Sequence, residues 1–170
     1  MSIQLNSKAN AKLAQEVHIN AHEFTTDIAI AEGGEDLGPS PHDLYDAALA
    51  SCKALTLMWY AKKKNINITH IDTRIERDDS QERQGIYKLA ATLLVQGEFS
   101  DEEFAQISAV AEKCPVHKLM ASVTTEITWV SPRVNSAEPC TLGITSISDS
   151  ICLICVGVRP SIRFSSVMII

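Results

Sequence analysis

The feature that most constrains the fold is one long amphipathic helix in the first half of the chain. Ser40 can cap such a helix, Pro41 suits its first position, and Asp43 stands where a carboxylate stabilises exposed backbone N–H groups. Apolar residues then recur at helical spacing and form one face that includes a cysteine: Leu44, Ala48, Cys52, Leu55 and Trp59. We predict that the helix ends near Lys64-Asn65.

Predicted strands lie on both sides of this helix. Segments with β-favouring, roughly alternating residues occupy 12–20, 22–31, 66–77, 86–97 and 123–130. A capping box at Ser100-Asp101-Glu102-Glu103 starts a second helix, which carries Cys114 at its end because Pro115 cannot extend the hydrogen-bond ladder. Residues 116–120 form at most a short further turn. The predicted class is α+β, with an antiparallel sheet, two main helices and the order β-β-α-β-β-α-β.

The C-terminal part has a different character. From Arg133 to Ile170 there is no lysine and no clear period. We therefore predict a domain over 1–131 and an atypical tail over 132–170 that is disordered or loosely packed, either an unrelated extension or the product of an altered reading frame. The Cys-x-x-Cys at Cys152 and Cys155 lacks a second pair and a strand-to-helix setting, so we assign it no function.

Composition and charge exclude several function classes. A net charge of −6 and no long basic run argue against nucleic acid as a partner. No apolar run reaches the ~20 residues of a membrane span, and residues 1–13 lack a secretory signal, so we expect a cytoplasmic protein with no membrane partner. No phosphate-binding loop is present. His18 and His22 lie in a predicted strand, where four residues span ~13 Å, so we expect neither a metal nor a cofactor.

Cys52 and Cys114 are the candidates for chemistry. They lie on apolar faces of two different helices and could meet across a core or a dimer interface. Such a pair suits a two-cysteine thiol peroxidase, in which one thiolate becomes a sulfenic acid and the second thiol condenses with it. Spacing alone is a weak signal for this chemistry and favours two inert, buried hydrophobic thiols.

Two motifs carry a resemblance to a known family. The segment Gly-Pro-Ser-Pro-His-Asp-Leu-Tyr-Asp-Ala-Ala-Leu-Ala-Ser-Cys, residues 38–52, resembles the first-cysteine segment of the OsmC/Ohr family of hydroperoxide-handling proteins. Cys-Pro-Val-His-Lys, residues 114–118, is similar to its second-cysteine segment. The resemblance covers residues 8 to 130 and implies an intertwined homodimer. It also implies that Cys52 attacks an organic hydroperoxide, that Cys114 resolves the intermediate, and that a cellular dithiol recycles the pair.

One departure from the family pattern concerns the first cysteine. The family uses an early-strand arginine, held by a glutamate at the helix start, to lower the pKa of that cysteine. No arginine precedes Arg74 here, so the chain is similar to the broader OsmC-like branch with the Gly-Pro-Ser-Pro motif. Asp43 is our candidate for the acidic partner, although alignment from Cys52 places His42 there. The candidates for the missing cation are Lys12, His18, His22 and His117. The alternative function is a non-catalytic dimer that binds a small apolar ligand or senses oxidants.

Overall fold

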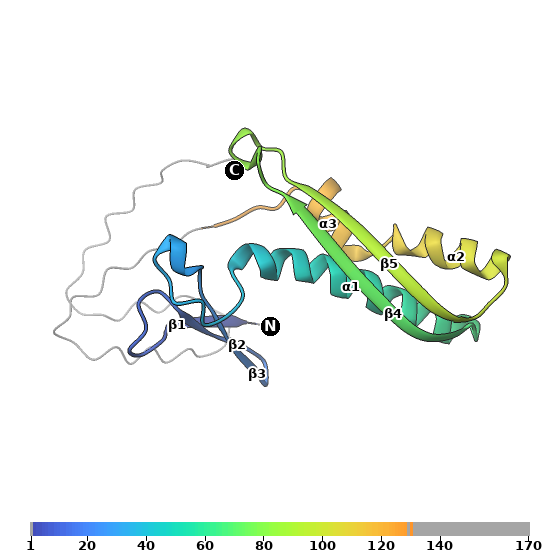
Figure 1. The fold of residues 1–170 in the computed structure, drawn as a ribbon, viewed down its shortest axis with the longest axis horizontal. Helices are drawn as coiled ribbons and strands as arrows, with labels where there is room; N and C mark the ends of the chain where they lie inside the picture. The colour runs from blue at the N-terminus through green and yellow to red at the C-terminus, as the bar shows by residue number, and fades with distance from the viewer. Residues whose placement is uncertain (1, 129, 131–170) are drawn as a thin grey trace, which may run out of the picture. The chain divides into compact units, whose positions relative to one another are not determined.

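A computed structural model describes residues 2–128 and 130 of the chain. The chain divides into two compact units, residues 1–125 and 126–170. All the helices and strands named below belong to the first unit (Figure 1). The tail predicted over 132–170 lies outside the described residues, so its predicted disorder and the domain boundary at residue 131 stay predictions.

The N-terminal strands form a three-stranded antiparallel sheet in the order β1-β2-β3. Its strands are β1 (Ile3–Ser7), β2 (Gln15–Ile19) and β3 (His22–Thr26). Strands β2 and β3 were predicted, although β3 ends at Thr26 and a short 3-10 turn, η1 (Ile30–Glu32), follows. The sequence analysis missed β1, whose alternating Ile3 and Leu5 are outnumbered by polar neighbours. Leu5 and Phe24 pair with Val17 from opposite sides of β2.

Tight backbone packing joins this sheet to the long helix at the Gly-Pro-Ser-Pro segment. A Cβ on Gly38 would lie 2.0 Å from the carbonyl oxygen of Thr25, so only glycine fits there. The next carbonyl, that of Pro39, accepts hydrogen bonds from the Thr26 hydroxyl at 2.7 Å and from the Asp27 N–H at 3.4 Å. The motif thus fixes the direction in which the chain enters the helix.

The predicted long helix is confirmed as α1 (Pro41–Lys64). The Ser40 side chain accepts the N–H of Asp43, and the Asp43 carboxylate accepts the N–H of Ser40, which forms a complete capping box. At the other end Asn65 adopts the left-handed conformation with φ 59°, and its N–H bonds back to the last carbonyls of the helix. Both ends are therefore set by local sequence.

A long antiparallel hairpin follows and packs against α1 (Figure 1). It consists of β4 (Asn67–Asp78) and β5 (Lys88–Glu98), joined through the 3-10 turn η2 (Glu82–Gln84). This agrees with the predicted hairpin. The main core lies between the hairpin, α1 and the next helix, and its buried members are Leu57, Ala61, Ile66 and Ile107.

Two shorter helices complete the described fold. The first, α2 (Asp101–Ala111), begins at the predicted Ser100 capping box. The second, α3 (Pro115–Ser122), is longer than the single turn that we predicted after Cys114. The strand predicted over 123–130 was wrong for residues 123–128, where the described backbone forms no strand. A strand needs a hydrogen-bonded partner, and alternation in the sequence does not supply one.

The buried face of α1 differs from the apolar face that we traced in the sequence. The buried residues are Asp46, Leu49, Lys53, Leu57 and Ala61. In the apolar face around Cys52, by contrast, Leu55 is 69% and Trp59 is 63% exposed. Helical periodicity identifies an apolar face but not whether the same chain covers it. The α+β class and the antiparallel strand pairing are confirmed, with two separate sheets in place of one.

Candidate functional site

Cys52 and Cys114 meet where α1 packs against α2 and α3. Cys52 lies in the middle of α1 and is half-buried, whereas Cys114 is fully buried at the residue that caps α3. Each thiol shifts the pKa of the other, and both cysteines are free. Two of the three predicted site residues are therefore brought together, although they lie far apart in the chain.

The surroundings of Cys52 favour its thiolate. Burial raises the pKa of the Cys52 thiol, but hydrogen bonds from the Cys114 thiol, the Val116 N–H and the Thr56 hydroxyl lower it, and so does the charge of Lys53. The net direction is a pKa below the ordinary value of a thiol. The thiolate is the nucleophilic form of cysteine, and a lowered pKa favours it.

Cys114 has the opposite character. Burial, followed by the interaction with Cys52, raises the pKa of its thiol. Hydrogen bonds from the His117 and Val116 N–H groups lower the pKa, but the net direction is upward. The His117 N–H donates to the Cys114 sulfur at 3.4 Å, as expected for a side chain that caps a helix. The pKa values of the two thiols are therefore shifted in opposite directions.

Lys53 is a site residue that the sequence analysis missed. The residue is only 7% exposed, and its ammonium group donates a hydrogen bond of 2.9 Å to the carbonyl oxygen of Ala111. Ala111 is the last residue of α2 and precedes Cys114 by three positions. One sequence signal was available: Lys53 stands at helical spacing between Leu49 and Leu57, within an otherwise apolar series.

The structure does not bring Asp43 to the two cysteines. Asp43 and Cys52 are nine positions apart in α1, which is ~13 Å along the axis and about half a turn around it. Asp43 instead completes the capping box and binds the guanidinium of Arg77 at 2.7 Å. Hydrogen bonds from the Ser40 side chain and backbone, followed by the one from Arg77, lower the pKa of Asp43 to about 2.

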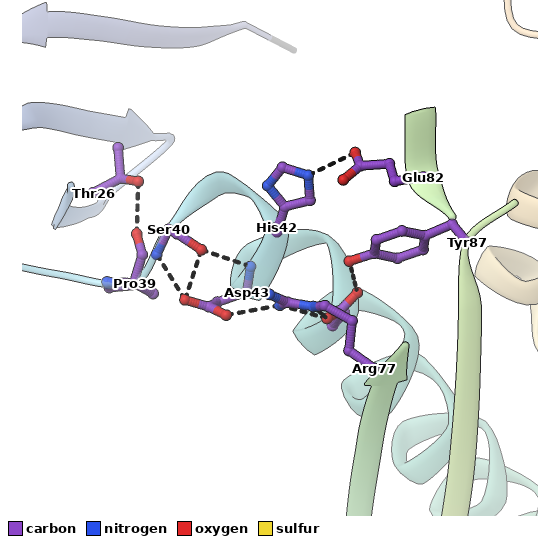
Figure 2. Close-up of polar contacts among 9 residues, drawn as sticks. Thr26, Pro39, Ser40, His42, Asp43, Arg77, Glu82 and Tyr87 are labelled. Atoms are coloured by element: carbon purple, nitrogen blue, oxygen red, sulfur yellow. Dashed lines mark hydrogen bonds and ion pairs between the residues drawn. The ribbon is translucent and has the colours of Figure 1, made fainter. Parts of the chain in front are cut away.

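Arg77 links β4 to the first two turns of α1 (Figure 2). Its guanidinium binds Asp46 at 2.5 Å as well as Asp43, and hydrogen bonds to both carboxylates raise its pKa despite burial. The Asp46 side chain is 10% exposed, so this carboxylate is paired as buried charges must be. An arginine thus binds the acidic residue at the helix start, but it comes from β4 and not from an early strand.

Two further contacts from the hairpin extend this cluster. Tyr87 donates its hydroxyl to Asp46 at 3.0 Å, and burial together with that hydrogen bond raises the pKa of Tyr87 to about 12. His42 contacts Glu82 at 2.9 Å (Figure 2). These bonds fix the first turns of α1 against the hairpin, and we refer to Asp43, Asp46, Arg77 and Tyr87 as the arginine cluster.

A polar depression of about 370 Å³ borders the arginine cluster and the start of α1. Its lining includes Asp27, Asp43 and Arg77. Burial opposes ionisation of Asp27, but backbone N–H groups of the surrounding loop, including those of Ile28 and Glu35, hold its pKa below the ordinary value. The Asp27 carboxylate therefore organises this loop and has its acceptors occupied.

The cations that we considered for Cys52 form no described side-chain hydrogen bond with it. In the described contacts, none of the side chains of Lys12, His18, His22 and His117 forms a hydrogen bond with either cysteine; His18 binds Glu23 at 3.1 Å. No cluster of three or more potential metal ligands occurs within residues 2–128. None of the described helices combines the length and the apolar character that a membrane span requires.

The described helices and strands define an α+β protein. Its buried Cys114, between α2 and α3, lies close to Cys52 of α1. The family model for OsmC-like proteins matches residues 33–129, and the chain belongs to that family. The organic hydroperoxide resistance protein OhrB of Bacillus subtilis (strain 168) is 31% identical in an alignment of 121 residues, which covers 66% of this chain and 87% of the relative.

Solved structures agree on the fold. An OsmC-like protein from Mycoplasma pneumoniae superposes with a TM-score of 0.58 at 18% identity, over 72% of this chain and 87% of the other. An OsmC-like protein from Vibrio cholerae O1 biovar eltor superposes with a TM-score of 0.53 at 14% identity, over 74% and 94%.

Proposed function

We propose that this protein reduces organic hydroperoxides and protects against oxidative stress through Cys52 and Cys114. The observation that carries the proposal is a pair of free thiols, one half-buried and one buried, whose pKa values are shifted in opposite directions. Membership of the OsmC-like family and the relation to a hydroperoxide resistance protein support the choice of substrate.

The proposed reaction has three balanced steps. The Cys52 thiolate attacks the distal peroxide oxygen; the O–O bond breaks, a proton is taken up, and an alcohol leaves while Cys52 becomes a sulfenic acid. The Cys114 thiol then attacks the Cys52 sulfur, which releases water and forms a disulfide. A cellular dithiol reduces that disulfide by exchange and is itself oxidised to a disulfide. No cofactor enters the scheme.

We extend the proposal to a homodimer in which a second copy covers the apolar face of α1 next to Cys52. The support is the exposure of Leu55 and Trp59, large apolar side chains that follow Cys52 on that face. Because the recycling step needs reduced dithiols, we also propose a cytoplasmic location. For Asp43 we propose a supporting role, in which it holds Arg77 and the helix start.

The test is oxidation of the reduced, full-length protein with one equivalent of tert-butyl hydroperoxide, followed by peptide mass spectrometry. We expect rapid loss of two thiols per chain and a disulfide between the Cys52 and Cys114 peptides. Cys114→Ser should stop at a sulfenic acid on Cys52, which dimedone traps, because the resolving thiol is missing.

The controls separate this chemistry from general thiol oxidation. Cys52→Ser should abolish peroxide consumption, whereas a variant with serine at Cys140, Cys152 and Cys155 should consume it at the wild-type rate. Thiol content that stays unchanged over hours would reject the peroxidase and favour the non-catalytic dimer.

A further inference from the structure

We infer that Lys53 is the cation of the thiol site: a positioning residue whose charge favours the thiolate of Cys52 and whose hydrogen bond fixes the end of α2 beside Cys114. The inference rests on the proposed function for its biological meaning. Its test, however, measures the thiol itself and needs no peroxide.

The burial of Lys53 is the first observation. Lysine is almost never fully buried without a partner, because removing an ammonium from water is costly. Lys53 is 7% exposed, and its polar contact is the carbonyl oxygen of Ala111 at 2.9 Å. That carbonyl lies in the last turn of α2, where helix carbonyls lack intrahelical partners and the helix dipole is negative.

This partner satisfies a hydrogen bond but does not neutralise the charge. None of the ion pairs formed by the described side chains involves Lys53. The Ala111 carbonyl carries no net charge, so it supplies a hydrogen bond and no countercharge. A thiolate on Cys52 would supply that countercharge.

Among the groups that lower the pKa of Cys52, Lys53 is the charged one. The other contributors are the Cys114 thiol, the Val116 N–H of α3 and the Thr56 hydroxyl of α1, all neutral donors. From β4, Arg77 is bound to Asp43 and Asp46 near the start of α1. Lys53 is therefore the charged side chain among the contributors named for Cys52.

The same contact also positions Cys114. The chain passes from Ala111 to Cys114 in three residues, and the ammonium of Lys53 holds the first of them. Two substitutions separate the effect of the charge from the effect of the hydrogen bond to Ala111. Lys53→Gln keeps a hydrogen-bond donor without the charge, whereas Lys53→Arg keeps both the donor and the charge.

The experiment measures the rate at which iodoacetamide alkylates Cys52 in the reduced full-length protein from pH 5 to 9, with mass spectrometry of the Cys52 peptide. For Lys53→Gln we expect the pH profile to move to higher pH and the rate at pH 7 to fall by a factor of about three. Lys53→Arg should keep the wild-type profile. Lys62→Gln, which removes an exposed lysine from the last turn of α1, is the matched control and should not move it.

Three results would overturn the inference: a Lys53→Gln profile identical to wild type, an equal shift for Lys62→Gln, or a folded Lys53→Arg protein whose profile moves upward. If Lys53→Gln does not fold, as judged by circular dichroism, the Lys53→Arg profile alone decides. A shifted profile without peroxide consumption would refute the proposed function and leave this inference standing. Peroxide consumption with an unshifted Lys53→Gln profile would refute this inference and leave the proposed function standing.

Discussion

Replacing Arg77 with methionine should destabilise the protein far more than an ordinary surface substitution on the same strand. The guanidinium binds two carboxylates of α1, and Asp46 is the buried one. Methionine keeps the apolar part of the side chain but leaves the Asp46 carboxylate with the Tyr87 hydroxyl as its hydrogen-bond donor. A buried charge that loses its counterion is one of the few causes of a large mutational effect.

The size of the effect follows from the exposure of each partner. Breaking a fully buried ion pair costs about 3–5 kcal/mol, and an exposed pair is worth about 1 kcal/mol or less. The side chains of Arg77 and Asp46 are 26% and 10% exposed, whereas that of Asp43 is 51% exposed. We therefore expect about 2–4 kcal/mol in total, mostly from Asp46, which lowers Tm by roughly 5–10 °C for a chain of this size.

Urea unfolding followed by circular dichroism measures this free energy. The matched control is Arg74→Met, also on β4, whose arginine side chain is 77% exposed and pairs with Glu76; we expect it to cost less than about 0.5 kcal/mol. In an Asp46→Asn background Arg77→Met should cost much less than in wild type, because no buried charge is left unpaired. Equal effects of Arg77→Met and Arg74→Met, or full additivity with Asp46→Asn, would refute the reasoning.

Two further predictions concern the helix entry and the proposed dimer. Gly38→Ala should cost about 2 kcal/mol or more in urea unfolding, since its Cβ would lie 2.0 Å from the Thr25 carbonyl oxygen and the backbone must shift. Gly85→Ala, with φ 79° but open space around its Cβ, should cost only about 1 kcal/mol; the reverse ranking would contradict the steric argument. Leu55→Glu should convert the proposed dimer to monomers in light scattering after size-exclusion chromatography, because it puts a charge into the apolar face of α1, while Lys62→Glu should not. A wild-type monomer at micromolar concentration would reject the dimer.

Local sequence was sufficient where local chemistry decides the structure. The starts of α1 and α2 were predicted because Ser40 and Ser100 form capping boxes within three residues. Strand β1 was missed because it is stabilised by pairing with β2 and not by its own composition. The strand predicted after Ser122 was wrong for the converse reason. The sequence pattern there favours a strand, but residues 123–128 do not form one.

The site, like the fold, was predictable only where a local motif marks its residues. Cys52 and Cys114 could be named because two motifs mark them, and Asp43 because it stands at a helix start. Arg77 could not be named, since its partners lie more than thirty residues away and nothing in the sequence states which strand reaches them. Lys53 was visible as a lysine in an apolar helical series, but its carbonyl partner depends on the packing of α2.

The roles that we propose for the two cysteines are supported by their burial and not only by the family motif. A peroxide must reach the attacking sulfur from solvent, and Cys114 is completely covered while Cys52 is partly accessible. The attacking sulfur must also be ionised, whereas the resolving thiol is needed only after a sulfenic acid has formed. The opposite pKa shifts of the two thiols fit both requirements, because the pKa of Cys52 is lowered and that of Cys114 is raised. Exchanging the roles would require the fully covered sulfur, whose pKa is raised, to react first, which is the slower course on both counts.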